Sequence, residues 1–287
     1  AAELRAAAAF ADWNPSHFLD VAEMTLALAV GYDWLYQDLD SATREAVAAA
    51  ILEKGLRTSL KHAGWVKASN NWGQVCHAGM LAGALALMDR EEALAAEIAH
   101  RAITHLPISM RAFAPNGCYP EGPGYWSYGT DFNVLALAML EHAFKTDFGL
   151  SALPGFRETA HFLDLVTGPS GLTFNYADGG SGRSTDCALW WFAKRFEQPD
   201  VLAYFERGAF ADYCRNRTPY TGERDFDRLF AFTLFWLQSL PDGLVPRAPL
   251  AWSSDGHVPI VVMRTSWDNA TALFVGLKAG SPAAPHG

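Results

Sequence analysis

The sequence feature that most constrains the fold is an apolar periodicity typical of amphipathic helices, which extends from Ala1 to about Leu240. Apolar residues recur three and four positions apart, as at Phe132, Leu135 and Met139, so that they share one face of a helix. The sequence therefore predicts a mainly helical fold, which begins with an alanine-rich helical segment at Ala1. The further helices that we expect have these approximate bounds: His17–Tyr36, Ser41–Ala63, Trp72–Met88, Glu91–His105, Tyr125–Phe144, Phe156–Leu165, Cys187–Phe196 and Phe226–Leu240.

Several of the connections between these helices are long and rich in glycine and proline, namely Pro115–Gly124, Gly168–Ser184 and Pro241–Asp255. Loops of this length in a folded domain are often functional. Successive helices of similar length, joined by alternating short and long connections, suggest stacked helical hairpins. We expect these hairpins to form a complete or incomplete α/α toroid.

The composition of the sequence changes after Asp255. Val258–Thr265 is rich in β-branched residues, Thr271–Leu277 is a second short apolar run, and Asp268-Asn269 between them is a turn signal. This pattern predicts a β-hairpin. Because a lone two-stranded hairpin is marginally stable in water, it must either dock on the helices or belong to a larger sheet.

The charge balance excludes several kinds of partner. The formal net charge is −9 at pH 7, so bulk attraction to nucleic acid or to anionic membranes is not expected, and a polyanionic substrate would need a locally basic groove.

Polar residues interrupt the longest apolar runs, which favours amphipathic helices over membrane spans, and no signal peptide is visible. The four cysteines form no CxxC pair, so a zinc ribbon is not supported and their disulfide state stays open.

Polar and aromatic residues concentrate in three segments at loops or helix starts: Ser69–His77, Tyr119–Gly129 and Phe174–Arg183. The first two segments resemble the paired signatures of the heparinase II/III-like polysaccharide lyases, a superfamily that also includes alginate lyases and relatives of dermatan sulfate epimerase. Asp12–Asp20 and Gly31–Tyr36 are also similar to bacterial members of this group. The resemblance covers most of the chain.

The resemblance extends to the last residues, because Pro285-His286-Gly287 is similar to the start of a His-Gly-His stretch in the family's β-sandwich. It implies an α/α toroid catalytic domain over residues 1–250 and the start of a truncated β-sandwich domain over residues 251–287. It also implies a periplasmic or secreted bacterial enzyme. The family's metal-binding positions would follow Gly287, so we expect no cofactor within this chain, and a structural zinc or calcium would belong to the missing part of the sandwich.

The chemistry that the resemblance implies is β-elimination at a uronic acid. Removal of the C5 proton builds charge on the adjacent carboxylate, which a neutral or cationic donor must stabilise. A base takes the C5 proton and an acid protonates the leaving glycosidic oxygen. By motif match, Asn71 takes the place of the family's carboxylate-neutralising asparagine and Tyr125 that of its catalytic tyrosine, which serves as acid and, if its pKa is depressed, as base. His286 matches a family histidine that acts as base or neutraliser.

This chain departs from the family pattern at Trp72, where many members have a histidine directly after the asparagine. Gln74 and His77 are possible substitutes, because Gln74 lies about one helical turn from Asn71 and His77 about one turn further. On residue type and position, the candidates for substrate binding are Trp72, Gln74, His77, Glu121, Trp126, Tyr128 and Arg183.

Each candidate also has a structural alternative. Asn70 or Asn71 could cap the helix that begins near Trp72, and one asparagine could serve each purpose. Tyr125 could be a packing anchor, with Tyr128 as the fallback catalytic tyrosine. The structural alternatives for the remaining candidates are core burial for Trp72 and Trp126, support of its loop for Glu121 and a surface salt bridge for Arg183. Asp178 could be a general base, but a turn residue is the favoured interpretation.

The leading functional hypothesis is a lyase that acts on an acidic polysaccharide such as alginate, glucuronan, ulvan or a glycosaminoglycan; the net charge tilts against heavily sulfated chains. A second hypothesis is a glycoside hydrolase on an α/α toroid, with Glu121 and Asp178 as opposed carboxylates. A third is an inactive carbohydrate-binding fragment. The sequence leaves the oligomeric state open.

Overall fold

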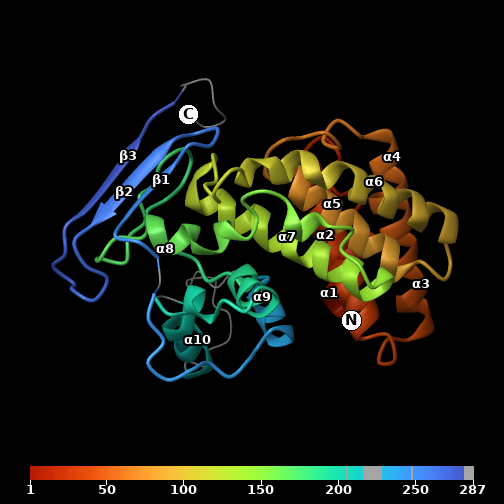
Figure 1. Cartoon of the computed structure of the whole chain (residues 1–287). Helices are drawn as coiled ribbons and strands as arrows, with labels where there is room; N and C mark the ends of the chain where they lie inside the picture. The colour runs from red at the N-terminus through yellow and green to blue at the C-terminus, as the bar shows by residue number, and fades with distance from the viewer. Residues whose placement is uncertain (205, 216–227, 247, 281–287) are drawn as a thin grey trace. The chain divides into compact units, whose positions relative to one another are not determined.

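The computed structural model describes residues 1–204, 206–215, 228–246 and 248–280. The α-helices in this part of the chain are α1 (Ala2–Ala9), α2 (Phe18–Trp34), α3 (Ser41–Ala50), α4 (Arg57–Lys61), α5 (Asn71–Ala86), α6 (Glu92–Met110), α7 (Gly122–Phe144), α8 (Phe162–Val166), α9 (Cys187–Arg195) and α10 (Glu206–Arg215) (Figure 1). The strands are β1 (Ala251–Ser254), β2 (Ile260–Arg264) and β3 (Phe274–Lys278). The prediction of a mainly helical chain is confirmed.

Shorter helical segments join several of these elements. One π-helix, η1 (Ile51–Leu56), lies between α3 and α4. The 3-10 helices are η2 (Arg111–Phe113), η3 (Leu150–Ala152), η4 (Glu158–His161), η5 (Pro199–Leu202) and η6 (Phe230–Phe235).

The chain folds into two compact units. Unit 1 comprises Ala1–Met110 and Phe132–Leu150, and unit 2 comprises Arg111–Asp131 and Ser151–Gly287. Each unit has its own buried side chains. The unit boundaries divide the candidate site residues between the two units. The predicted division of the chain into two domains at residue 250 stays a prediction.

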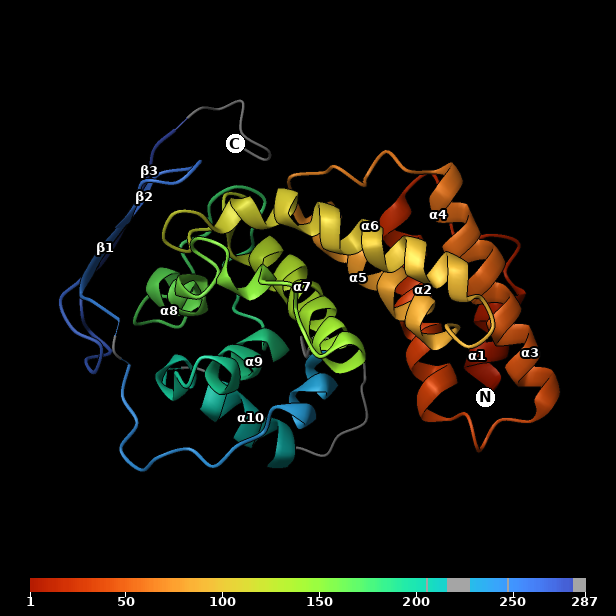
Figure 2. The same cartoon turned by 45° about the vertical axis from the view of Figure 1, so that its right-hand side comes forward.

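In unit 1 the helices α2, α5 and α6 lie side by side, as both views show (Figures 1 and 2). The sequence of α5 is rich in alanine and glycine, and almost every residue of this helix is buried. A Cβ atom on Gly79 would lie only 2.3 Å from the Ala22 carbonyl oxygen, so the close approach of α5 to α2 requires glycine at this position. This packing fixes α5, whose first turn carries the asparagine motif.

The expected helix over Ser41–Ala63 is interrupted by the π-helix η1, so it forms α3, η1 and α4 in succession. A π turn holds one more residue than an α turn but leaves the local apolar spacing nearly helical, and periodicity does not reveal it. At the start of this stretch Asp40 caps α3, because its side chain accepts a hydrogen bond from the Thr43 backbone N–H at 2.7 Å.

Unit 2 differs more from the expectations than unit 1 does. The expected helix over Phe156–Leu165 is 3-10 helix η4 followed by the short α8, and α10 was not expected. The expected helix over Phe226–Leu240 forms only the 3-10 helix η6 in the described part; residues 226 and 227 lie outside the described residues. The sequence of η6 is Phe-Ala-Phe-Thr-Leu-Phe, and aromatic and β-branched side chains lower helix propensity.

The strands form an antiparallel sheet in the order β1-β2-β3. The predicted hairpin is confirmed as β2 and β3, with Val261 opposite Leu277. The prediction of a loop over Pro241–Asp255 is wrong for Ala251–Ser254, which forms β1 and pairs with β2. Its four residues, two of them serine, carry too short an apolar alternation to indicate a strand.

The sheet docks on the helical part of unit 2 through β2. Ile260 and Val262 are buried, and the buried Arg264 guanidinium donates hydrogen bonds to the carbonyl oxygens of Asp164, Leu165 and Thr167 at 2.8–3.0 Å. A third strand and this docking together resolve the marginal stability of an isolated hairpin.

Two general findings concern the described residues as a whole. In those ranges, none of the helices combines the length and the apolar character that crossing a bilayer requires. No disulfide joins the four cysteines, of which Cys76, Cys118 and Cys187 are buried.

Candidate functional site

In unit 2, Tyr125 lies in the first turn of α7, directly after a loop that glycine makes possible. Gly122 has a backbone φ of +86°, and a Cβ atom there would lie 2.5 Å from the Tyr176 carbonyl oxygen. A residue with a side chain would therefore be strained and would clash. The close approach brings the segment around Tyr176 against the start of α7.

The Tyr176 side chain holds these two segments together. It is buried, and its hydroxyl donates a hydrogen bond to the Tyr119 carbonyl oxygen and lies 3.7 Å from the Cys118 sulfur. The next residue, Ala177, adopts a left-handed backbone conformation with φ of +55°. For a residue with a Cβ atom this conformation is uncommon and often marks a functional segment. It turns the chain so that Asp178 follows on the exposed side.

The Tyr125 hydroxyl donates a hydrogen bond to Oδ2 of Asp178 at 3.3 Å. Partial burial, then the Asp178 carboxylate and the more distant Glu121 raise the pKa of Tyr125 above its usual value near 10. The phenol is therefore protonated at neutral pH, as a proton donor must be. The depressed pKa that would make Tyr125 a base on its own is not found in this state.

Glu121 is almost completely buried, at 1% exposure, and its Oε2 accepts a hydrogen bond from the Tyr119 hydroxyl at 3.3 Å. Burial, followed by the Glu121 charge, raises the pKa of Tyr119 well above 10. Of the two roles expected for Glu121, this placement favours support of the loop over direct contact with sugar hydroxyls.

The two aromatic residues that follow Tyr125 have different surroundings. Trp126 is fully buried and its Nε1 donates to Thr159 Oγ1 at 2.7 Å, so its indole has no exposed face for a sugar. The structure thus corrects the expected substrate contact of Trp126 in favour of core burial. Tyr128 is half-buried, and the Arg228 guanidinium lies 5.5 Å from the centre of its ring.

Arg183 forms a buried ion pair rather than the surface pair that was considered. Its guanidinium donates to Asp164 Oδ1 at 2.6 Å, and the two side chains are 1% and 2% exposed. A second hydrogen bond goes to Thr167 Oγ1 at 3.3 Å. This correction assigns Arg183 to the core of unit 2 and leaves its expected substrate-binding role without support.

In unit 1, the two asparagines at the start of α5 have different structural roles. Asn70 is the N-cap residue, and its Oδ1 accepts a hydrogen bond from the Trp72 backbone N–H at 3.3 Å. Asn71 is the first residue of the helix and is buried, at 2% exposure. Because Asn70 caps the helix, Asn71 is not needed for that purpose.

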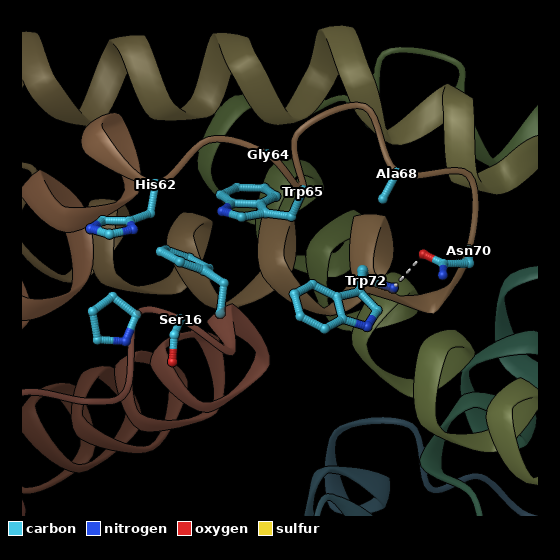
Figure 3. Close-up of a pocket in the computed structure, with 9 residues that line it drawn as sticks. Ser16, His62, Gly64, Trp65, Ala68, Asn70 and Trp72 are labelled. Carbon is cyan, nitrogen blue, oxygen red and sulfur yellow. Dashed lines mark hydrogen bonds between the residues drawn. The ribbon is translucent and has the colours of Figure 1, made fainter.

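Beside Asn70 and Trp72 lies a groove with a volume of about 440 Å³, shown in Figure 3. Its lining residues come from the segment before α2, the loop before α5 and the first turn of α5, and we call it the tryptophan groove: Pro15, Ser16, Phe18, His62, Gly64, Trp65, Ala68, Asn70 and Trp72. Aromatic and apolar surfaces in this groove are flanked by polar edges, a composition common in small-molecule sites.

Aromatic packing within unit 1 fixes the walls of the tryptophan groove. The buried Trp65 stacks on Phe18 with ring centroids 5.1 Å apart. Trp72 is half-buried and meets the edge of the His17 ring at 5.0 Å. Trp72 is therefore the predicted substrate-binding tryptophan that keeps exposed ring surface, whereas Trp65 was missed because no motif surrounds it.

Gln74 and His77 lie deeper in α5, where both are buried. Nε2 of His77 lies 3.1 Å from the Val66 carbonyl oxygen, which can only accept, so this nitrogen carries the hydrogen. Burial lowers the pKa of His77 to about 3. His77 is thus a neutral core histidine, and its burial does not support substitution for the histidine that is missing at Trp72.

His286 lies outside the described residues. Among the residues that the structure describes, no three or more histidine, cysteine, aspartate or glutamate side chains are grouped as a metal site would need. The chain matches no family model and no curated protein.

Proposed function

We propose that this protein is a polysaccharide lyase that cleaves a uronic-acid-containing polysaccharide by β-elimination. The observation that carries the proposal is the half-buried Tyr125 hydroxyl, which is protonated and is held by Asp178 at the start of α7. A phenol in this state can give its proton to a leaving oxygen. The resemblance of the two motifs to the heparinase II/III-like lyases points to the same reaction.

The reaction requires a base, an acid and a group that neutralises the uronate carboxylate. The base removes the C5 proton, the C4–O4 bond breaks as the C4=C5 double bond forms, and the departing O4 takes a proton from the acid. In this proposal the acid is Tyr125. The resemblance gives His286 the role of base or neutraliser.

Asn71 is the proposed neutraliser of the uronate carboxylate. An amide donates hydrogen bonds without titrating, so it can stabilise the additional charge across a wide pH range. Its place at the start of α5 supports the role, because Asn70 already serves as the cap of the same helix. The positive end of the helix dipole at this terminus also favours an anionic group.

The tryptophan groove supports the choice of a carbohydrate substrate. Trp72 offers aromatic surface, and Asn70, Ser16 and His62 place polar atoms at the edges (Figure 3). We propose that a sugar ring packs on Trp72 in this groove. The proposal includes an α/α toroid with the beginning of a β-sandwich, an acidic polysaccharide as partner, and a periplasmic or secreted location.

The hydrolase alternative is less well supported. It needs two carboxylates that reach the glycosidic bond, whereas Oε2 of Glu121 accepts a hydrogen bond from the Tyr119 hydroxyl. An inactive carbohydrate-binding fragment is distinguished from the lyase by the absence of product.

The proposal is tested by incubating the full chain with alginate, glucuronan, ulvan and a glycosaminoglycan, and by following the ultraviolet absorbance of the unsaturated uronate. We expect product with at least one polymer, and a loss of about 10²–10⁴-fold in Tyr125→Phe. Tyr36→Phe, which alters an exposed tyrosine of unit 1, is the matched control and should keep full activity. Full activity in Tyr125→Phe would overturn the role of Tyr125, and Tyr128→Phe then tests the fallback tyrosine.

A further inference from the structure

Asp178 has no counterpart among the residues to which the motif resemblance gives a role, yet it makes a direct contact with the proposed acid. Its Oδ2 accepts the hydrogen bond from the Tyr125 hydroxyl at 3.3 Å. Asp178 is exposed, whereas Tyr125 is half-buried.

The segment that carries Asp178 is held in place on both sides. Before it, the buried Tyr176 bonds to the Tyr119 backbone, and the left-handed Ala177 redirects the chain. After it, the Gly179 N–H donates to the Tyr176 carbonyl oxygen at 3.4 Å. The Gly179 bond is that of an ordinary β-turn, and the buried Tyr176 is the side chain that holds this turn, and with it Asp178, in place.

The effect of a fixed carboxylate on the phenol follows from its charge. The acidic groups that act on Tyr125 include Asp178, which is directly bonded, and the more distant Glu121. Both are acidic, so both oppose ionisation of the hydroxyl. A general acid must hold its proton until the leaving oxygen departs, and it must point in one direction.

We propose that Asp178 is a positioning residue for Tyr125: its carboxylate accepts the hydrogen bond of the phenol and keeps the hydroxyl protonated and in place until the leaving oxygen replaces the carboxylate as the acceptor of that hydrogen. This inference rests on the proposed function for its catalytic consequence. It goes beyond that function because it assigns to a loop carboxylate the control of the acid, and because it predicts a pH dependence that the motifs do not.

The test is Asp178→Asn, which keeps an oxygen acceptor of similar size and removes the charge. Tyrosine ionisation is followed by ultraviolet difference titration, and the Tyr125 contribution is identified by subtraction of Tyr125→Phe. We expect the Tyr125 midpoint in Asp178→Asn to move to lower pH. The alkaline limb of kcat/KM should move in the same direction, and kcat at neutral pH should fall by about tenfold because a charge-assisted hydrogen bond is lost.

Two further variants serve as comparisons. Asp178→Glu keeps the charge and should retain a midpoint closer to that of the unaltered protein. Asp268→Asn, which removes an exposed carboxylate elsewhere in unit 2, should change neither the Tyr125 midpoint nor the activity.

The outcomes separate the two proposals. An unchanged Tyr125 midpoint in Asp178→Asn, with normal lyase activity of the unaltered protein, overturns the role of Asp178 alone. If the midpoint moves but the unaltered protein releases no unsaturated product from any polymer, the proposed function fails, and with it the catalytic role of Asp178.

Discussion

Replacement of Arg183 by methionine separates a structural from a substrate-binding role for this residue. Arg183 and Asp164 form a 2.6 Å ion pair in which the side chains are 1% and 2% exposed. Removing one partner of a buried pair leaves the other charge uncompensated, which costs about 3–5 kcal/mol. At about 2–4 °C per kcal/mol for a unit of this size, the midpoint of thermal unfolding should fall by roughly 6–20 °C.

The pH dependence of this loss has a definite sign. Burial raises the pKa of Asp164 above its ordinary value, and Arg183 acts in the opposite direction. Loss of Arg183 therefore raises that pKa further. Because an acid with a raised folded pKa binds a proton more tightly in the folded state, stability falls as pH rises above the ordinary carboxyl pKa near 4. The deficit of Arg183→Met should thus be smallest in acid and grow toward neutral pH.

Thermal and urea unfolding measured from pH 4 to pH 7 provide the assay. The double variant Arg183→Met with Asp164→Asn removes both charges and should recover part of the loss. Arg157→Met, which alters an exposed arginine in the same unit, should change stability by less than about 1 kcal/mol. A stable Arg183→Met protein with a raised KM would contradict the structural role of this ion pair and would return Arg183 to the substrate-binding residues.

Two other predictions concern α5. Asn70→Ala removes the cap and should lower the free energy of unfolding, measured in urea, by about 1 kcal/mol, whereas Asn70→Asp should retain most of the stability. Equal stability of the unaltered protein and both variants would show that the Trp72 N–H does not depend on this cap. His77 has a folded pKa of about 3, below its ordinary value near 6.5, so its contribution to stability is present above pH 6.5 and is lost as pH falls toward 3. Its ring resonances, followed by NMR, should not titrate between pH 5 and pH 8; a midpoint in that range would contradict its burial.

The elements predicted best are those whose signals are local. The bounds of α2 and α5 follow from apolar spacing, and the turn signal at Asp268-Asn269 correctly separates β2 from β3. In contrast, β1 exists because β2 offers it a hydrogen-bonding edge, and its own four residues carry little information. The formation of β1 therefore depends on its pairing with β2, which the local sequence pattern does not reveal.

The same limit applies to the candidate site. Asn70 and Asn71 were both candidates for the cap, and only the geometry of α5 shows that Asn70 has that role. Trp126 and Arg183 carry side chains that suit a sugar or a carboxylate, but their burial depends on partners 33 and 19 residues away, Thr159 and Asp164. Sequence alone supplies residue type and spacing, and it does not say which face of a segment is covered.

The tryptophan groove is the clearest case of a feature without a sequence signal. Phe18 and Trp65 stack although they are far apart in the chain, and neither belongs to the asparagine motif that led to Trp72. In unit 2, the prediction that Asp178 is a turn residue, which is the usual role of aspartate beside glycine, is confirmed, because the Gly179 N–H closes the turn on the Tyr176 carbonyl oxygen. Its contact with Tyr125 depends on the anchoring of Tyr176, which only the fold brings about.

The masses of the products distinguish elimination from hydrolysis of a uronate polymer. A single cleavage of a defined oligouronate by elimination gives two fragments whose masses sum to that of the parent, and one fragment carries the C4=C5 double bond. We predict this result for the unaltered protein and its loss in Tyr125→Phe. Fragments whose masses together exceed the parent by one water would show hydrolysis and would contradict the account.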